Sequence, residues 1–481
     1  MKYSKISNTL SALMLGLFCV LMAVAVLLGV GNFAYKSYIA AFAFALLLFV
    51  GYLLLRKKLG NSCSILDRVS RGKLLALLSF LCLLVNGAWI IFFRIEPSAD
   101  FKTYWLYAQS LAENKVAINH YVSLFPHIFG FSYLVSLLIK IFGANQLLVP
   151  VCNVILTCCS GILVFNLCEK EYGKKAAAYA YILWIICPSK LIYNAMVLSE
   201  PLYTFLILLF IYIVYSLDSD SNGIKKKAIV FILAGLTSGL ILRVINCVRP
   251  ISAILLIAFA IWFLLLRGEK VKRTDSWKTF GLFVVLVLTV YIPTKGLWNS
   301  YVTERMGEEP STVTGYSVYV GFNPETGGSY SNDDMNELFS CYFGQNLSAT
   351  ESHQVLLEKA KERMKSGEIN YPVFITGKIR TFLGNDEGGA FYASEALSST
   401  EYSLLCIISN VFYYFLVLLS VAGALLLIRT KRYSALQLCP LYILGLTCAH
   451  MLVEVAGRYH YSIIPMLILT AAAFLGKSKE S

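Results

Sequence analysis

Long apolar runs recur along the whole chain, and they constrain its fold more than any other feature of the sequence. Runs of about 17–25 residues are long enough to cross the hydrocarbon core of a bilayer as helices. Apolar residues make up 58% of the chain and charged residues 14%, whereas soluble domains have about 45–50% and about 25%. The sequence therefore predicts an all-α polytopic membrane protein with about 12–13 transmembrane or re-entrant helices. The expected spans are about 9–30, 37–55, 74–93, 128–144, 146–168, 175–187, 201–216, 228–247, 250–267, 278–296, 401–428, 438–453 and 462–476.

Charge and cysteine usage argue against two other classes of protein. The formal net charge of +13 would suit nucleic acid, but the basic residues lie in short loops beside apolar runs, as in the cytoplasmic loops of membrane proteins. Nearly all of the 13 cysteines lie inside apolar runs, where cysteine behaves as a small hydrophobe, and no spacing typical of a zinc site occurs. We therefore expect membrane lipids, and no nucleic acid, as partners.

Lysine and arginine predict the orientation of the helices. They are concentrated in 56–73, 225–227, 267–278, 429–432 and 477–479. Such basic loops are typical of the cytoplasmic side. The segment 297–400 instead carries 14 of the 28 acidic residues and only 7 basic residues, so we expect it outside.

The crossings do not add up when every apolar run is counted as a span. A cytoplasmic 56–73 puts 94–127 outside, whereas counting back from 297–400 through Lys174 and Lys175 requires one crossing fewer. Either 128–144 is re-entrant or interfacial, or the basic pair near residue 174 faces outward. In both cases the two polar segments share one face of the membrane.

The chain is expected to have four regions. These are 1–73 (two N-terminal transmembrane helices and a basic cytoplasmic loop), 74–296 (a membrane module with first external loop 94–127), 297–400 (an extracytoplasmic loop domain) and 401–481 (C-terminal transmembrane helices and a basic tail).

The loop domain is predicted to be small and to mix helices with strand. Its segment 315–334 is rich in Gly, Asn and Tyr, which predicts turns with one short strand. Helical spacing covers 352–365, with Ser352 as the N-cap. Residues 372–383 predict an amphipathic helix that carries Lys378 and lies at the membrane surface.

Asp100 follows the third apolar run, at the start of the first external loop. Tyr104, Trp105 and Tyr107 form an aromatic group typical of a membrane interface. Helical spacing over 103–113 predicts a helix that lies flat at this interface. A partly desolvated carboxylate there suits the removal of a proton from an acceptor hydroxyl. The alternative is an ordinary solvated acid.

Glu200 lies in the sequence Leu198-Ser199-Glu200-Pro201, before another apolar run. Ser199 is expected to cap the helix that Pro201 begins, and an acid at a helix N-terminus is favourable without any function. In the functional interpretation, Glu200 and Tyr104 position an acceptor or a divalent metal. The metal question is left open, and no other cofactor is expected.

Two arginines, Arg243 and Arg249, lie in LILRVINCVRP between two apolar runs. An arginine within a span costs about 2.5–3.5 kcal/mol on insertion scales, so it normally has a partner. Phosphate is a suitable partner because the guanidinium fork binds it with two hydrogen bonds. Snorkelling or an internal ion pair is the alternative.

The last external loop reads EVAGRYHYSIIP. Glu454 and Arg458 are four residues apart and would pair on one face of a helix. The functional interpretation instead places Arg458, Tyr459 and His460 on the same phosphate as Arg249.

Weaker candidates complete the set. His127 ends the first external loop, where a lone histidine is more often structural than catalytic, and the same holds for His460. Lys378 is a further candidate in the loop domain, whereas His353 is expected to be exposed and without a role.

In order and spacing, these motifs resemble the GT-C superfamily of polyprenyl-phosphate-sugar-dependent glycosyltransferases. Within it they are most similar to glycosyltransferase family 39, with protein O-mannosyltransferases and lipid A aminoarabinose transferases as relatives. The resemblance covers about 74–475 and rests on PSADFKTYWLYAQSL, LFPHIFGFSYLVSLLIKIFG, LSEPLYTFLILLFIYIVY, LILRVINCVRP and GRYHYSIIP. Phe101 stands where many members of family 39 have a second acid after the first.

The resemblance implies a GT-C-like fold and an inverting glycosyltransferase of the bacterial cell membrane with its site facing outward. Asp100 would be the general base, and Arg249 and Arg458 would bind the carrier phosphate, with Arg243 and Tyr459 as further contacts. The implied donor is a polyprenyl-phosphate-linked sugar. The acceptor would be a glycan, lipid or protein of the cell envelope.

Two other classes of protein share many of these features. A transporter or flippase of lipid-linked sugars would have similar spans and outer aromatic residues, but the long external loop and the absence of repeats argue against it. A non-catalytic scaffold leaves the arginines between the apolar runs unexplained.

Overall fold

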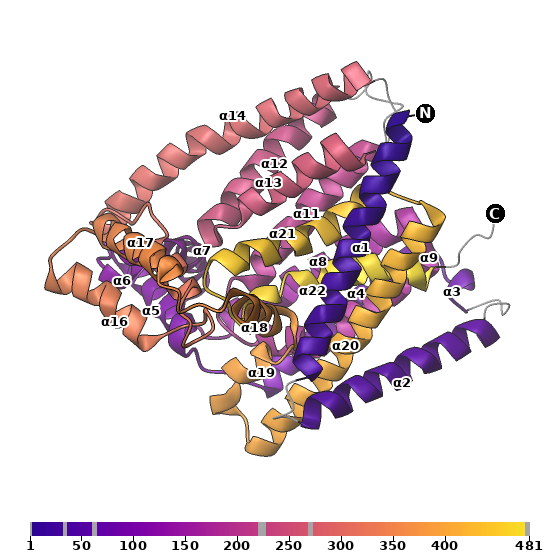
Figure 1. Ribbon diagram of the computed structural model, residues 1–481, viewed down its shortest axis with the longest axis horizontal. Coiled ribbons are helices and arrows are strands. Elements are labelled where there is room, and N and C mark those ends of the chain that lie inside the picture. The colour runs from indigo at the N-terminus through magenta and orange to yellow at the C-terminus, as the bar shows by residue number, and fades with distance from the viewer. Residues whose placement is uncertain (1, 32–35, 60–64, 220–227, 268–272, 477–481) are drawn as a thin grey trace.

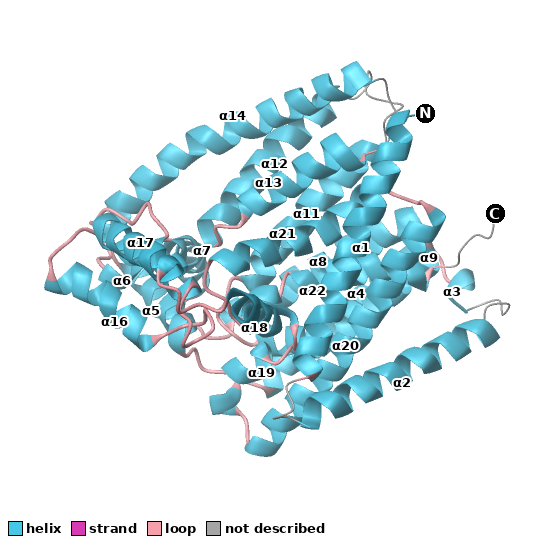
Figure 2. Ribbon diagram, in the orientation of Figure 1, coloured by secondary structure: helices cyan, strands magenta, loops and turns pink. Residues whose placement is uncertain are grey.

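The computed structural model describes residues 2–31, 36–59, 65–219, 228–267 and 273–476. Within these ranges all regular structure is helical, and long helices lie side by side with short helices gathered at one end (Figures 1 and 2). We call this the domain end, because it carries α16 to α19, and the other end, where α1 begins, the opposite end. The basic segments 225–227 and 477–479, together with Lys270 and Lys272, lie outside the described residues.

The predicted multi-pass membrane fold is confirmed. In the described ranges nine helices are long and apolar enough to cross a membrane, and α9 with α10 forms a further candidate span bent by 55°. The bundle consists of α1 (Lys2–Val30), α2 (Lys36–Leu59), α4 (Arg71–Phe92), α8 (Leu148–Tyr172), α9 (Lys174–Ile186), α10 (Pro188–Asn194), α11 (Glu200–Ser219), α12 (Ala228–Val248), α13 (Ser252–Ile261), η2 (Trp262–Leu266), α14 (Arg273–Met306), α20 (Ser399–Thr430), α21 (Leu438–Leu452) and α22 (Ile463–Leu475). The short α3 (Ile65–Arg68) and η5 (Ala435–Gln437) connect its helices.

Helix α7 (His127–Phe142) accounts for the surplus crossing in the predicted topology. It follows α5 (Ala99–Glu113) and α6 (His120–Leu124), and Figure 1 looks almost along it. Near its end, Ile139 packs in the same core as Phe101 and Val149, so α7 starts and finishes at the domain end. The first alternative for 128–144, a re-entrant or interfacial helix, therefore agrees with the structure.

The basic pair near residue 174 lies at the opposite end of the bundle. Lys174 donates to the carbonyl oxygen of Val69 at 2.9 Å, and the neighbouring Arg71 pairs with Glu169 at 2.6 Å. With α7 left out, successive spans alternate between the two ends without a conflict.

The two polar segments lie together at the domain end. The amide of Ala117 donates to the carbonyl oxygen of Arg305 at 2.9 Å, and that of Ser311 donates to Ser123 at 2.8 Å. These bonds join the segments 94–127 and 297–400 along a shared edge.

The loop domain contains helices where a strand was expected, so the prediction of a mixed domain is wrong. Tyr316 and Val320, four residues apart on α15, are both buried against Leu356 of α17, and this spacing is helical. The domain consists of α15 (Gly315–Gly321), α16 (Asn332–Phe339), η3 (Ser340–Gly344), α17 (Ala349–Lys365), α18 (Tyr371–Leu383), α19 (Gly388–Tyr392) and η4 (Ser394–Ala396).

The start of α17 differs from the prediction by one turn. Ser348 caps the helix and exchanges hydrogen bonds with Glu351, in the arrangement known as a capping box. Ser352 lies inside the helix and donates to the carbonyl oxygen of Ser348. His353 is buried rather than exposed, and its Nδ1 accepts a hydrogen bond from the amide of Tyr316 at 3.3 Å.

Lys378 fastens the loop domain to the end of α21 and the residue that follows it. Its ammonium group is fully buried and donates to the carbonyl oxygens of Gly321 (2.7 Å), Val453 (2.7 Å) and Met451 (3.3 Å). Burial lowers the pKa of Lys378 to about 8, although Glu454 acts in the other direction. The three carbonyl groups come from the end of α15, from the last turn of α21 and from the residue that follows α21, so Lys378 holds α15 against the end of α21.

Gly321 allows the end of α15 to approach the segment after α21 closely. An added Cβ would lie 2.5 Å from the carbonyl carbon of Val453 and 2.9 Å from the amide nitrogen of Glu454. We expect Gly321→Ala to lower the free energy of unfolding by about 1–3 kcal/mol because backbone atoms must move apart. The measurement is thermal unfolding of the purified protein in detergent.

The matched control is Gly377→Ala, in the middle of α18. A Cβ there meets open space, and alanine is favoured over glycine in a helix by about 1 kcal/mol, so its Tm should be unchanged or higher. A Gly321→Ala protein as stable as the wild type would contradict the close packing of α15 on this segment.

Candidate active site

Asp100 lies in the first turn of α5 and pairs with an arginine 358 positions later in the chain. Its Oδ2 accepts a hydrogen bond from Nη2 of Arg458 at 2.5 Å, and its Oδ1 accepts one from the Tyr121 hydroxyl at 3.5 Å. Ala99, just before it, has φ +45°, a left-handed conformation that costs an L-residue roughly 1–2 kcal/mol. Strain of this kind collects at functional sites.

Arg458 belongs to η6 (Gly457–His460), the short turn before α22. Its guanidinium carbon lies 5.5 Å from the ring centroid of Phe101, 5.1 Å from that of Tyr392 and 5.4 Å from that of Tyr459. Its side chain is only 9% exposed. Aromatic rings and one carboxylate therefore hold this cation in place.

His460 anchors the same turn to the end of α18 and to Asp386. Its Nδ1 lies 2.7 Å from the carbonyl oxygen of Phe382, and its Nε2 lies 3.0 Å from Oδ1 of Asp386. The ring stacks on Tyr413 with 5.5 Å between centroids. His460 is buried and positions the turn, rather than facing Asp100 directly.

Arg249 lies between α12 and α13 and meets Arg458 at a shared tyrosine. Its guanidinium carbon lies 4.5 Å from the ring centroid of Tyr459. Among the residues that the structure describes, the Arg249 guanidinium has no hydrogen-bond or ion-pair partner, although Asp100 and Glu200 act on it through space. The structure thus brings two of the three predicted phosphate-binding arginines, Arg249 and Arg458, to one place.

Glu200, Tyr104 and His127 surround this place. Glu200 begins α11, is buried, and acts electrostatically on both arginines. Tyr104 is buried on α5, 5.2 Å from the ring of Phe131. His127 begins α7. The predicted cap at Ser199 is wrong, because its buried hydroxyl makes no hydrogen bond.

Glu454 is the main residue whose environment the sequence interpretation missed. The alternative interpretation paired it with Arg458 on one face of a helix, but residues 454–456 are not helical. Its Oε1 accepts a hydrogen bond from the Tyr459 hydroxyl at 3.3 Å instead. We refer to Asp100, Glu200, Arg249, Glu454, Arg458 and Tyr459 as the arginine–carboxylate cluster.

The remaining predicted residues lie elsewhere. Arg243 donates to the carbonyl oxygen of Tyr291 at 2.8 Å and stacks on its ring at 4.1 Å, away from the cluster. Both partners are neutral, so they are not the internal ion pair that the sequence offered as an alternative. The ammonium group of Lys378 donates its hydrogen bonds to three backbone carbonyl oxygens.

Two carboxylates of the cluster, Asp100 and Glu454, have opposite electrostatic environments. Burial by itself would raise the pKa of Asp100, but Arg458 holds it below the usual value. Burial raises the pKa of Glu454 above the usual value, although Arg458 acts against the increase. Asp100 is therefore the better stabilised anion of the two.

The described residues include no group of three or more His, Cys, Asp and Glu side chains that could hold a metal ion. Within the cluster Asp100 pairs with Arg458, and Glu454 accepts a hydrogen bond from the Tyr459 hydroxyl. A divalent metal at Glu200 and Tyr104, which the sequence left open, stays a prediction.

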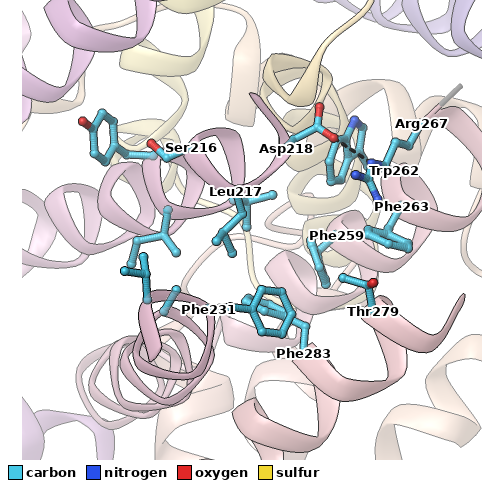
Figure 3. Close-up of a pocket in the computed structure, with 15 residues that line it drawn as sticks. Ser216, Leu217, Asp218, Phe231, Phe259, Trp262, Phe263, Arg267, Thr279 and Phe283 are labelled. Carbon is cyan, nitrogen blue, oxygen red and sulfur yellow. Dashed lines mark hydrogen bonds and ion pairs between the residues drawn. The ribbon is translucent and has the colours of Figure 1, made fainter. Parts of the chain in front are cut away.

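A separate cavity of about 250 Å³ lies between α11, α12, α13 and α14. Figure 3 shows its aromatic lining, which includes Phe231, Phe259 and Phe283, and the ion pair of Arg267 with Asp218 at 2.6 Å. Asp218 is 18 residues along α11 from Glu200, a distance of about 27 Å at the rise of an α-helix. None of the predicted site residues lines this cavity.

Comparisons with known proteins give a family match and three similar structures. A family model described as dolichyl-phosphate-mannose-protein mannosyltransferase matches residues 126–293. No curated protein matches the chain. The archaeal oligosaccharyltransferase AglB from Archaeoglobus fulgidus, in complex with an inhibitory peptide and a dolichol-phosphate, has a TM-score of 0.49 at 11% identity. That comparison covers 85% of this chain and 50% of the other, so the chain spans about half the length of the oligosaccharyltransferase.

A second solved structure is ArnT from Cupriavidus metallidurans bound to undecaprenyl phosphate. It has a TM-score of 0.38 at 10% identity, over 84% of this chain and 78% of that one. The family match is the more specific finding, because it covers α7 to α13, most of α14 and two members of the cluster, Glu200 and Arg249. It supports the resemblance that the motifs predict, because residues 126–293 are similar to a family described as dolichyl-phosphate-mannose-protein mannosyltransferase.

Proposed function

We propose that this chain transfers a sugar from a polyprenyl-phosphate carrier to an acceptor hydroxyl, with inversion, at the arginine–carboxylate cluster. The observation that carries the proposal is Arg249, whose guanidinium lies beside Tyr459 without an ionic partner among the described residues. A cation at the end of a span calls for an anion, and phosphate fits a guanidinium with two hydrogen bonds. The matching family is named for a dolichyl-phosphate sugar, which supports the same class of donor.

The reaction needs one displacement at the anomeric carbon. The acceptor oxygen attacks C1 of the sugar, and the bond from C1 to the phosphate oxygen breaks, so that polyprenyl phosphate leaves with the electron pair. Arg249 and Arg458 stabilise the negative charge that grows on this phosphate, as preorganised cations do. The acceptor proton passes to a carboxylate of the cluster, and the family resemblance gives this role to Asp100. No step is assigned to a metal.

The domain end is proposed to face outward from a bacterial cell membrane. The acid-rich segment 297–400 and the basic residues at the opposite end support this orientation. Nucleotide sugars are not available outside the cytoplasm, which favours a donor carried by a lipid. Glycans, lipids and proteins of the cell envelope are the acceptors that such a site would reach.

Replacement of Asp100 tests the proposed site. We expect Asp100→Asn to reduce sugar transfer by about 100-fold or more, because the change removes a carboxylate at the acceptor and the anion that holds Arg458. The measurement uses membrane vesicles from cells that express the chain. Undecaprenyl phosphates with labelled sugars are supplied, and label in envelope material is counted.

The matched control is Glu96→Gln, which neutralises an exposed acid in the same loop and should leave transfer unchanged. Full transfer by Asp100→Asn would contradict a role for this carboxylate. Movement of the labelled donor across the bilayer by the wild type, without any transfer of sugar, would identify a transporter instead.

Replacement of Arg249 tests the phosphate site. We expect Arg249→Gln to raise the KM for the donor by about 10- to 100-fold, since a hydrogen bond to a charged group contributes about 1.5–3 kcal/mol. Arg249→Lys should be intermediate, because lysine keeps the charge but loses the two-bond fork. The measurement is the initial rate of transfer against donor concentration.

Arg380→Gln serves as the control for charge, because Arg380 is exposed on α18. It should leave the donor KM unchanged. An unchanged donor KM in Arg249→Gln would place the carrier phosphate elsewhere.

A further inference from the structure

Two carboxylates of the arginine–carboxylate cluster are held in different ways. Both oxygens of Asp100 accept hydrogen bonds, one from Arg458 and one from Tyr121. Glu454 accepts a single hydrogen bond, at 3.3 Å from the Tyr459 hydroxyl. Within the described part of the chain Glu454 forms no ion pair, so one of its oxygens is left for another donor.

The backbone around Glu454 is fixed, so its carboxylate has a defined place. The amide of Glu454 donates to the carbonyl oxygen of Ser317 at 2.8 Å, and the amide of Val455 donates to that of Gly328 at 2.9 Å. The carbonyl oxygen of Glu454 lies 3.0 Å from Nδ1 of His450. Three contacts thus hold a segment that has no regular structure of its own.

Charged and titratable groups face Glu454 from every neighbouring element. The two arginines approach from η6 and from the end of α12, and Lys378 approaches from α18. The groups that act on Glu454, or on which it acts, are Asp100, Tyr121, Arg249, Tyr316, Tyr330, Lys378, Tyr392, Arg458 and Tyr459.

The environments of the two acids suit different tasks. A general base works best when its pKa lies near the working pH, and a pair of acids with pKa values pushed apart indicates a division of roles. Burial raises the pKa of Glu454, whereas Arg458 keeps that of Asp100 low. Protonation of Asp100 is unfavourable, because it would break the ion pair of Asp100 with Arg458.

We propose that Glu454, rather than Asp100, accepts the proton of the acceptor hydroxyl, while Asp100 holds Arg458 and orients the acceptor. The inference rests on the proposed function. In the step, the acceptor O–H bond breaks and its proton moves to the free oxygen of Glu454. The acceptor oxygen bonds to C1, and the carrier phosphate departs with the electrons of the old bond.

The test compares pH profiles of transfer in the vesicle assay. Because the base must be ionised, the wild-type rate should rise with pH through the pKa of Glu454 and then level off. Glu454→Gln should reduce kcat by about 100-fold or more with little change in the donor KM, and this acidic limb should disappear. Glu454→Asp should keep part of the rate and retain a limb, shifted in pH.

Asp100→Asn separates the two roles. It should also transfer slowly, but its rate should still rise with pH through the same limb as the wild type. Glu325→Gln, at an exposed acid of the same external region, should keep both the rate and the limb. Thermal unfolding of each purified variant shows whether a lost rate reflects lost folding. If Glu454→Gln does not fold, the pH profile of Glu454→Asp tests the proposal instead.

A limb that persists in Glu454→Gln and disappears in Asp100→Asn would overturn the proposal and return the base to Asp100. A limb that both variants retain would also overturn it. A wild type that transfers no sugar from any of the supplied carriers would instead refute the proposed function itself, and the two failures are therefore distinct.

Discussion

The ion pair between Asp100 and Arg458 is the contact on which the candidate site depends. It joins α5, within the segment 94–127, to the turn before the last helix, 358 positions away. Arg458 is nearly buried, and a buried charge that loses its partner is costly. The rings of Phe101, Tyr392 and Tyr459 enclose the same guanidinium. The first loop, the loop domain and the last loop thus meet around one cation.

The loop domain positions the segment after α21 and supplies none of the proposed reacting groups. Lys378 gathers carbonyl groups from the end of α15 and from the segment after α21, and Gly321 lets these backbones touch. The amide of Glu454 then bonds to Ser317 of α15. A segment without helix or strand becomes a fixed platform because neighbouring helices supply its backbone partners.

Much of the fold could be predicted because apolar length and helical spacing are local properties. Among the described residues, nine of the expected runs are helices long enough to span, 175–187 belongs to a bent pair, and 128–144, 250–267 and 462–476 are shorter apolar helices. The composition of 315–334 misled, because glycine and tyrosine there are typical of turns and strands. Packing of Tyr316 and Val320 on α17 selected a helix instead. The placement of α7 could not be predicted from the sequence either. Its apolar residues fit a span or an interfacial helix, and only the packing of Ile139 near Val149 decides between them.

The site shows where inference from residue type ends. Arg249 could be found from its sequence alone, because an arginine beside apolar runs needs an anion. The partner of Arg458 could not, since a spacing of four residues favours Glu454 only if the backbone is helical. After α21 the chain is extended at Val453, with φ −128° and ψ 177°. That break frees Arg458 for Asp100 and leaves Glu454 without an ion pair, so a local change of backbone conformation decides which of two acids remains available for a proton.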